Sequence, residues 1–299
     1  MSDEQFLAAQ FEQHRAELRA VAYRMLGSLS DADDAVQEAW LRLSRSADDE
    51  IDNLGAWLTT VVGRVCLNML RARTRRREAA MPVHIPDPIV APEGELDPEH
   101  QAILADSVGL ALLVVLDALS PDERLAFVMH DMFAVPYKDI AAMIGRSPAA
   151  TRQLASRAKR RVQGEAPRSD AGLSEQRQIV DAFFAAARDG DFEALVAVLD
   201  PDVVLRSDGG ARRAGATFLV RGAAEVASRA MVYASMSPFV LPAIVNGSAG
   251  VVVAPRGTAF SVMAFTVRHG KVIAIDSLAD PSRLGRLDLA VPGEQGGTK

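Results

Sequence analysis

The chain has 299 residues, of which 49% are hydrophobic, and a formal net charge of −6. That length favours two or more domains, each large enough to bury its own core. One cysteine excludes an intramolecular disulfide, the Cys and His positions lack metal-ligand spacing, and the longest apolar run is too short to span a bilayer. The N-terminus also lacks a secretory pattern. We therefore expect a cytoplasmic protein that needs no metal or cofactor.

The acidic average conceals a segregation of charge along the chain. Residues 71–77 hold five arginines, whereas residues 78–106 hold seven acidic residues and no lysine or arginine. Locally basic segments on an acidic chain are typical of a protein that meets nucleic acid at particular surfaces and another protein elsewhere.

Residues 6–77 are predicted to be helical. The first helix ends near Gly27, and the second begins at Ser30 with acidic residues in its first turn, where the helix dipole favours them. The polar face of this second helix consists of Asp34, Gln37, Glu38 and Arg42. After a polar loop over residues 44–54, a third helix runs from Gly55 into the arginine-rich segment.

Three residues of these helices invite a chemical role, but their spacing favours the core. Trp40 and Trp57 lie at apolar positions of the helical pattern, so we expect packing before base stacking. Cys66 lies among valines and leucines, which favours a buried apolar role over a reactive thiol.

Residues 78–106 form a proline-rich, acidic stretch without helical periodicity. This composition predicts a linker, and a flexible tether is its simplest interpretation.

Residues 107–163 are predicted to form a second helical domain. Residues 120–123 (SPDE) have the pattern of a capping box, and His130 is expected to be structural. A helix over residues 137–144, a turn at Gly145 and a second helix from Pro148 predict a helix-turn-helix. The expected apolar stripe of the second helix is Ala150, Leu154, Ala158 and Val162.

The outer face of that second helix is basic. Residues 151–161 contain five basic residues and no acidic one. The pattern by itself leaves two interpretations open, a helix that enters the DNA major groove and a helical hairpin with a solvated basic face.

The predicted secondary structure changes from all-helical to mixed helix and strand after a short polar linker over residues 164–173. Helices are predicted over residues 174–189, 191–199 and 222–234, together with long strands that follow tight-turn signals such as Asn246-Gly247 and His269-Gly270. Residues 174–286 therefore predict an α+β domain with a curved, cone-shaped sheet, and residues 287–299 a disordered tail.

Three stretches of the chain resemble two conserved regions of a known family. Residues 31–43 (DADDAVQEAWLRL) and 56–77 (AWLTTVVGRVCLNMLRARTRRR) resemble the second conserved region of the extracytoplasmic-function (ECF) sigma factors of bacterial RNA polymerase. Residues 119–162 (LSPDERLAFVMHDMFAVPYKDIAAMIGRSPAATRQLASRAKRRV) resemble their fourth region. The resemblance implies two all-α sigma domains, over residues 1–77 and 107–163, that bind core RNA polymerase and the −10 and −35 elements of promoter DNA.

The resemblance also assigns roles to individual residues. Core polymerase would be bound by Asp34, Gln37, Glu38 and Arg42. The −10 element would be contacted by Asn53, Arg64, Asn68, Arg71 and Arg73, with Arg64 standing where many members carry Asn. The −35 element would be contacted by Ala149, Thr151, Arg152, Gln153, Ser156, Arg157, Lys159 and Arg160. The linker of the family threads toward the polymerase active-site and RNA-exit path.

The C-terminal part resembles the SnoaL-like, NTF2-like fold. Residues 207–210 (SDGG) resemble a DGGGK motif of sigma factors with this fused domain, although Ala211 replaces the third glycine. The implied regulatory motif is Asp208, Gly209, Gly210 and Arg212. Residues 280–284 and the Pro-x-Pro stretch at 84–89 resemble two further motifs of that group.

This resemblance implies a regulatory domain that modulates the sigma factor, with a possible small-molecule ligand and no need for a separate anti-sigma factor. The alternative is an isomerase or cyclase for a polyketide- or steroid-like substrate, tethered to a DNA-binding module, with Asp208 or Asp276 as the carboxylate base in the pocket. A polymerase-independent repressor is a third possibility.

Overall fold

The computed structural model describes residues 3–45, 51–76, 83–93 and 109–289. The chain divides into two compact units, one formed by residues 1–80 and 115–165 and the other by residues 81–114 and 166–299. We call them the helical unit and the sheet unit and describe each by itself. Most of the expected linker and the last ten residues of the expected tail lie outside the described residues.

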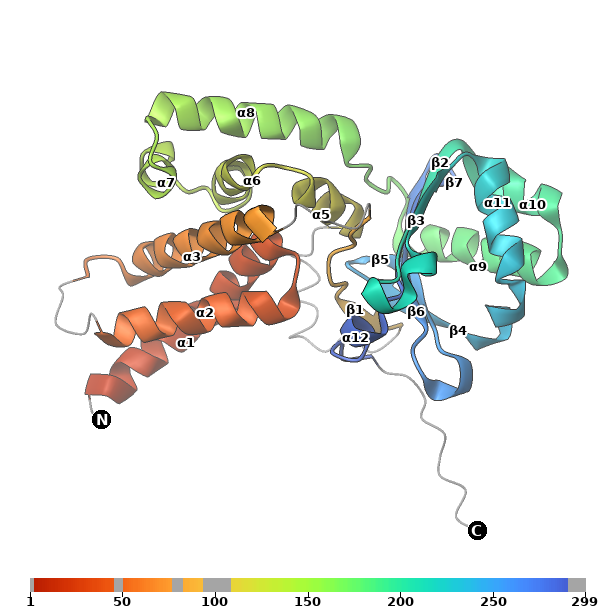
Figure 1. The fold of residues 1–299 in the computed structure, drawn as a ribbon, viewed down its shortest axis with the longest axis horizontal. Coiled ribbons are helices and arrows are strands. Elements are labelled where there is room, and N and C mark those ends of the chain that lie inside the picture. Colours follow the sequence, from red (N-terminus) through yellow and green to blue (C-terminus); the bar gives the residue numbers. More distant parts are fainter. Residues whose placement is uncertain (1–2, 46–50, 77–82, 94–108, 290–299) are drawn as a thin grey trace, which may run out of the picture. The chain divides into compact units, whose positions relative to one another are not determined.

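Three helices begin the helical unit: α1 (Asp3–Leu26), α2 (Leu29–Arg45) and α3 (Leu54–Arg76). They pack together, as Figure 1 shows. The chain turns at Gly27 with φ of 65°. Ser28 accepts the Asp31 N–H at 3.4 Å, so α2 begins one residue before the predicted Ser30. Trp40 packs against Phe11, with ring centroids 5.2 Å apart, which agrees with its predicted role in packing.

The second group of helices contains the predicted helix-turn-helix. It follows α5 (Leu110–Asp117), α6 (Pro121–Phe127) and a π-helical turn (Val128–Met132), and consists of α7 (Tyr137–Ile144) and α8 (Pro148–Glu165). The capping box at α6 is present in both directions, and α7 ends on Gly145 with φ of 76°. The Ser147 hydroxyl accepts the Ala150 N–H at 3.2 Å, as predicted.

The apolar stripe of α8 follows its predicted position at three of four residues, because Leu154, Ala158 and Val162 are buried. Thr151 and Ala155 are buried as well, whereas Ala150 is only half-buried. His130 has the expected structural role, because its Nδ1 lies 3.0 Å from the Val135 carbonyl and its ring stacks on Tyr137.

Helix α3 packs tightly against the second group of helices. A Cβ on Gly63 would lie 3.1 Å from Met129 Cε and 3.2 Å from Met143 Sδ, so a larger residue here would require these side chains to shift by a few tenths of an ångström. Arg124 is 1% exposed and donates to the Arg24 carbonyl at 3.1 and 3.2 Å and to Asp117 at 3.0 Å. Burial raises the pKa of the Cys66 thiol to about 12, which agrees with the predicted apolar role.

The sheet unit is built on a seven-stranded sheet of order β1-β4-β5-β6-β7-β2-β3. Its strands are β1 (Val90–Pro92), β2 (Leu199–Asp208), β3 (Phe218–Arg221), β4 (Val240–Val245), β5 (Ser248–Val253), β6 (Ser261–Arg268) and β7 (Lys271–Leu278). Neighbours are antiparallel except β2 and β7, which are parallel. The predicted turns at Asn246-Gly247 and His269-Gly270 are present, with positive φ at all four residues.

Three helices cover one face of this sheet (Figure 1). They are α9 (Leu173–Asp189), α10 (Phe192–Val198) and α11 (Ala223–Val232), and a short helix, α12 (Pro281–Leu284), follows β7. Their apolar side chains bury one continuous core with the sheet, around Phe183, Leu205 and Phe265. The α+β prediction is confirmed, but β1 and β3 were not predicted.

Candidate nucleic-acid interface and linker clamp

The polar face of α2 is turned to solvent. Asp34 and Gln37 are exposed, and the half-exposed Glu38 and Arg42 form an ion pair at 3.0 Å. All four lie opposite the buried residues of the helix. This face therefore offers a ready polar surface to a partner protein.

The candidates on α3 divide into three kinds. Arg64 and Asn68 are exposed one turn apart, so both are free to contact DNA. Asn53 is also exposed, but its Oδ1 accepts the Ala56 N–H at 3.0 Å and thereby caps the helix. Arg73 donates to the Leu26 carbonyl at 2.9 Å and pairs with Asp31. This side chain ties α3 to the corner between α1 and α2, and the DNA contact expected of Arg73 stays a prediction.

The exposed face of α8 carries most of the predicted −35 residues. The exposed ones are Ala149, Arg152, Gln153, Ser156, Arg157, Lys159 and Arg160. Thr151 is the exception, because it is fully buried and its hydroxyl donates to the Ser147 carbonyl at 3.0 Å. The prediction for Thr151 is wrong, because this position belongs to the buried side of the helix. Lys159 pairs with Asp131 at 2.8 Å, and this hydrogen bond raises the pKa of the lysine, which stays charged.

A groove within the helical unit brings candidates of α3 and α8 together. Its walls are Asn68, Arg71, Thr74, Arg75, Ser120, Pro121, Asp122, Glu123, Arg146, Leu154 and Arg157. Asp122 accepts from Arg71 at 2.8 Å and from Arg146 at 3.3 Å, and Glu123 lies 3.7 Å from Arg157. The acidic first turn of α6 therefore neutralises arginines from both helices. The sequence explained these acids only as a capping box.

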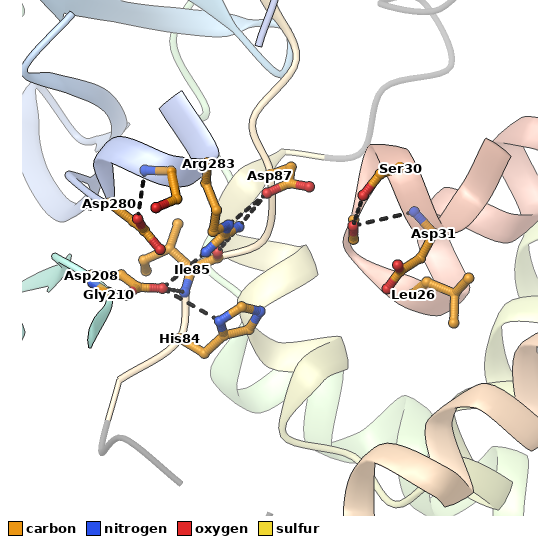
Figure 2. A network of polar contacts seen from close by, with 12 residues as sticks. Leu26, Ser30, Asp31, His84, Ile85, Asp87, Asp208, Gly210, Asp280 and Arg283 are labelled. Atoms are coloured by element: carbon orange, nitrogen blue, oxygen red, sulfur yellow. Dashed lines mark hydrogen bonds and ion pairs between the residues drawn. The ribbon is translucent and has the colours of Figure 1, made fainter. Parts of the chain in front are cut away.

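A second cluster of charge lies in the sheet unit, where it holds the described part of the linker. We call Asp87, Asp208 and Arg283 the linker clamp (Figure 2). Asp208 Oδ2 accepts the Ile85 N–H at 3.0 Å and Arg283 Nη1 at 3.0 Å. Arg283 also donates to the Ile85 carbonyl at 2.6 Å and, through Nε, to Asp87 at 2.7 Å. His84 Nδ1 lies 3.3 Å from the same Asp208 oxygen.

The electrostatics of Asp208 show that the clamp is fully satisfied. Asp208 is 3% exposed, and burial alone would raise its pKa. The hydrogen bonds from His84, Ile85 and Gly210 and the charge of Arg283 outweigh burial, so the pKa is lowered and the group is a carboxylate at neutral pH.

The two glycines after Asp208 shape this site. A Cβ on Gly209 would lie 2.2 Å from the Arg213 carbonyl oxygen, and a Cβ on Gly210, whose φ is +63°, would lie 2.2 Å from Asp280 Oδ2. The chain can thus fold back on itself here only with glycine. Arg212 is exposed, and its part in the regulatory motif stays a prediction, whereas its neighbour Arg213 donates to the Phe260 and Ala279 carbonyls.

The linker continues from the clamp into the sheet. Asn246, which is 1% exposed, donates its N–H to the Ile89 carbonyl at 2.9 Å and accepts the Ile89 N–H on its Oδ1 at 3.0 Å. Residues 90–92 then pair with β4. The flexible-tether interpretation is wrong for residues 83–92, which are part of the sheet unit.

A cavity of about 110 Å³ lies between the sheet and its covering helices. Neither Asp208 nor Asp276 lines it. Asp276 is buried, which raises its pKa, and its charge partner Arg206 lies 3.0 Å away. Strand residues alternate between faces, so Asp208 and Asp276 lie opposite their cavity-lining neighbours Ser207 and Ser277. The predicted carboxylate base in the pocket is therefore wrong.

No helix in the described ranges is long and apolar enough to cross a membrane. No group of three or more His, Cys, Asp or Glu side chains in those ranges is placed to hold a metal ion.

Known family models match the two helical parts of the chain. The Sigma-70 region 2 family model matches residues 10–76, and the Sigma-70, region 4 model matches residues 109–162. ECF RNA polymerase sigma factor SigJ of Mycobacterium tuberculosis (strain ATCC 25618 / H37Rv) is 38% identical over 289 residues, or 92% of each chain. Probable ECF RNA polymerase sigma factor SigI of Mycobacterium tuberculosis (strain CDC 1551 / Oshkosh) is 34% identical over 98% of this chain and 100% of its own.

The likeness extends to three dimensions. The crystal structure of Mycobacterium tuberculosis SigJ superposes with a TM-score of 0.75 at 34% identity, covering 94% of this chain and 99% of that one. The similarity therefore includes the C-terminal α+β domain as well as the two helical regions.

Proposed function

Since the chain belongs to the ECF RNA polymerase sigma factors, which bind core RNA polymerase and promoter DNA and direct transcription initiation, we propose that its C-terminal domain modulates initiation by holding the linker. The observation that supports this proposal is the linker clamp, which holds residues 84–87 through Asp208 and Arg283. Sigma factors have no covalent chemistry of their own, and neither Asp208 nor Asp276 lines the cavity, so the isomerase alternative has no support in this site.

The geometry of the clamp supports a persistent hold. The Arg283 side chain is 18% exposed, and those of Asp87 and Asp208 are 12% and 5% exposed. Removing one partner of such a buried set leaves the others unpaired, at a cost of about 3–5 kcal/mol. A linker held on the sheet unit is not free to follow the path into polymerase that the family resemblance implies, so we expect the docked state to restrain initiation.

The clamp also bears on the proposal that no separate anti-sigma factor is needed. The restraining domain and the linker belong to one chain, so their contact is intramolecular and acts at an effective concentration in the millimolar range. A second protein would have to compete with that concentration.

We assign the DNA contacts to basic or polar side chains that reach the surface. For the −10 element these are the exposed Arg64 and Asn68 and the half-exposed Arg71. For the −35 element they are Arg152, Gln153, Ser156, Arg157, Lys159 and Arg160. We assign the binding of core polymerase to the polar face of α2.

The shared groove of the helical unit implies that this unit opens when it binds a promoter. Elements centred about 25 base pairs apart are separated by roughly 85 Å of B-DNA. Arg71 and Arg157, assigned to different elements, line one groove. They cannot reach both elements at once while they share it.

Run-off transcription with core polymerase tests the proposed modulation. Arg283→Leu removes the clamp cation, and Arg286→Leu is the matched control, because Arg286 is exposed three residues away. We expect Arg283→Leu to raise the initiation rate several-fold and Arg286→Leu to leave it unchanged. Equal rates from all three chains, with the linker shown to be released, would contradict the proposal.

A further inference from the structure

The cavity of the sheet unit has the size and walls of a site for a small apolar body. It measures about 110 Å³, and Phe183, Phe184, Leu205 and Ile275 are among its lining residues. An engineered apolar cavity of about 150 Å³ in another protein holds benzene. A single ring or a short branched chain therefore fits the scale of this cavity.

Three serines break the apolar lining. Ser207, Ser261 and Ser277 line the cavity and are 5%, 5% and 6% exposed. Among the described residues, none of the three hydroxyls has a hydrogen-bond partner in another side chain or the backbone. No fully enclosed side-chain N or O atom in the same ranges lacks a partner. The three hydroxyls must therefore reach the open space of the cavity.

The strand register gathers these hydroxyls at one end of the cavity. Ser207 and Ser277 are direct neighbours on the parallel strands β2 and β7, about 4.8 Å apart. Met263 is opposite Ser277 on β6, and Ser261 lies two residues from Met263 on the same face of that strand. Buried hydroxyls without partners are costly unless something binds them.

A cation stands at the same end. Arg229 of α11 lines the cavity with its guanidinium 4.6 Å from the centre of the Phe218 ring, and Phe218 is opposite Ser207 on β3. No carboxylate of the described residues pairs with Arg229, and the cavity lining includes no Asp, Glu or His. The polar end thus has the charge of Arg229 and several hydroxyl donors, while Arg213 lies beside it and donates to the carbonyls of the lining residues Phe260 and Ala279.

From this arrangement we propose that the cavity binds a small monocarboxylic acid with an aromatic or branched apolar body. The body lies against Phe183 and Phe184, and the carboxylate lies between Arg229 and the hydroxyls of Ser207 and Ser277. A guanidinium and hydroxyl donors together are the complement of a carboxylate. This binding site goes beyond the proposed modulation and does not depend on it.

Ligand-observed NMR with the full chain tests the site, with sodium benzoate as probe and benzamide as its neutral isostere. We expect benzoate to bind in the millimolar range and benzamide about tenfold more weakly, because the charge-assisted hydrogen bonds are lost. Arg229→Met should weaken benzoate binding about tenfold and abolish its advantage over benzamide. Arg221→Met, at an exposed arginine of the same domain, should change neither.

A second variant guards against a folding defect. Ser207→Ala combined with Ser277→Ala removes two hydroxyls without adding volume, and it should weaken benzoate binding while the melting temperature is maintained. The proposal is overturned if benzoate does not bind the native chain, if Arg229→Met binds it as well as the native chain does, or if benzamide binds equally well. Displacement of benzoate by inorganic phosphate would also overturn it, because it would show a general anion site.

Discussion

The helical unit and the sheet unit use arginine–carboxylate pairs in different ways. In the groove of the helical unit, Arg71 and Arg146 are 40% and 51% exposed and share Asp122. In the linker clamp, Arg283 is 18% exposed and is held by two carboxylates and a backbone carbonyl. Exposed pairs contribute about 0–1 kcal/mol, whereas buried sets are costly to break.

This difference separates ion pairs that DNA phosphates can replace from ion pairs that persist in the folded domain. Arginines of the groove can leave Asp122 and Glu123 for DNA phosphates at little cost, since the alternative partners are also anions in water. The clamp has no such alternative, because its partners are fixed within the fold. The helical unit is thus suited to open on DNA, and the sheet unit is suited to hold the linker until something displaces it.

The largest effect is expected from Asp208→Ala, which breaks the clamp at its most buried carboxylate. Arg283 and the Ile85 N–H lose a shared partner, so we expect the sheet unit to lose about 3 kcal/mol of unfolding free energy. Amide hydrogen exchange should show loss of protection at Ile85. Asp181→Ala, at an exposed position of α9, is the control and should change neither quantity. A protected Ile85 amide in Asp208→Ala would show that the clamp does not hold the linker.

A somewhat smaller effect is expected from Gly210→Ala. The positive φ and the approach of Asp280 both oppose a side chain here, so we expect a loss of about 2 kcal/mol in chemical denaturation. Gly215→Ala is the matched control, because a Cβ there meets nothing within 4 Å. Equal stability of the two variants would mean that the turn after Asp208 is not constrained as described.

The smallest effect on stability is expected from Asp122→Asn in the groove. Its partners are exposed, so the unfolding free energy should change by less than about 1 kcal/mol. Binding of promoter DNA by the full chain should nevertheless strengthen, more at low salt than at high salt, because Arg71 and Arg146 are released. Asp139→Asn in the first turn of α7 is the control. A large loss of stability, or unchanged DNA binding, would remove the distinction between exchangeable and persistent pairs.

The parts of the fold that the sequence predicted are those with local signals. The helix-turn-helix has its cap at Ser147 and its turn at Gly145 within a few residues of each other. The burial of Thr151 in α8 was missed, because Thr151 is polar by type and its hydroxyl is satisfied within its own helix. The contact of Arg73 with the Leu26 carbonyl was not predicted either, since the sequence of a basic helix does not tell an arginine that contacts DNA from one that contacts a carbonyl.

The sheet unit was less predictable because its contacts span long stretches of sequence. The pairing of β1 with β4 joins residues about 150 positions apart, and the contact of Asp87 with Arg283 joins residues 196 positions apart. Asp208 was recognised as part of a motif, but its partners and the face on which it lies depend on that distant pairing. Side chains alternate between the two faces of β2, so Ser207 points toward the cavity and Asp208 toward the linker. This alternation explains why Asp208, which was expected in the pocket, binds the linker instead.

A reversible disulfide between the linker and the sheet tests the central claim most directly. Ala91 and Ile244 are register partners on antiparallel strands, where Cα atoms lie about 4.5–5.5 Å apart, within the range that a disulfide spans. The natural Cys66 is buried and does not interfere. In run-off transcription with core polymerase, the oxidised double variant Ala91→Cys/Ile244→Cys should initiate several-fold less than the same chain after reduction, while the native chain responds to neither condition. Equal initiation by the locked and the released linker would contradict the account.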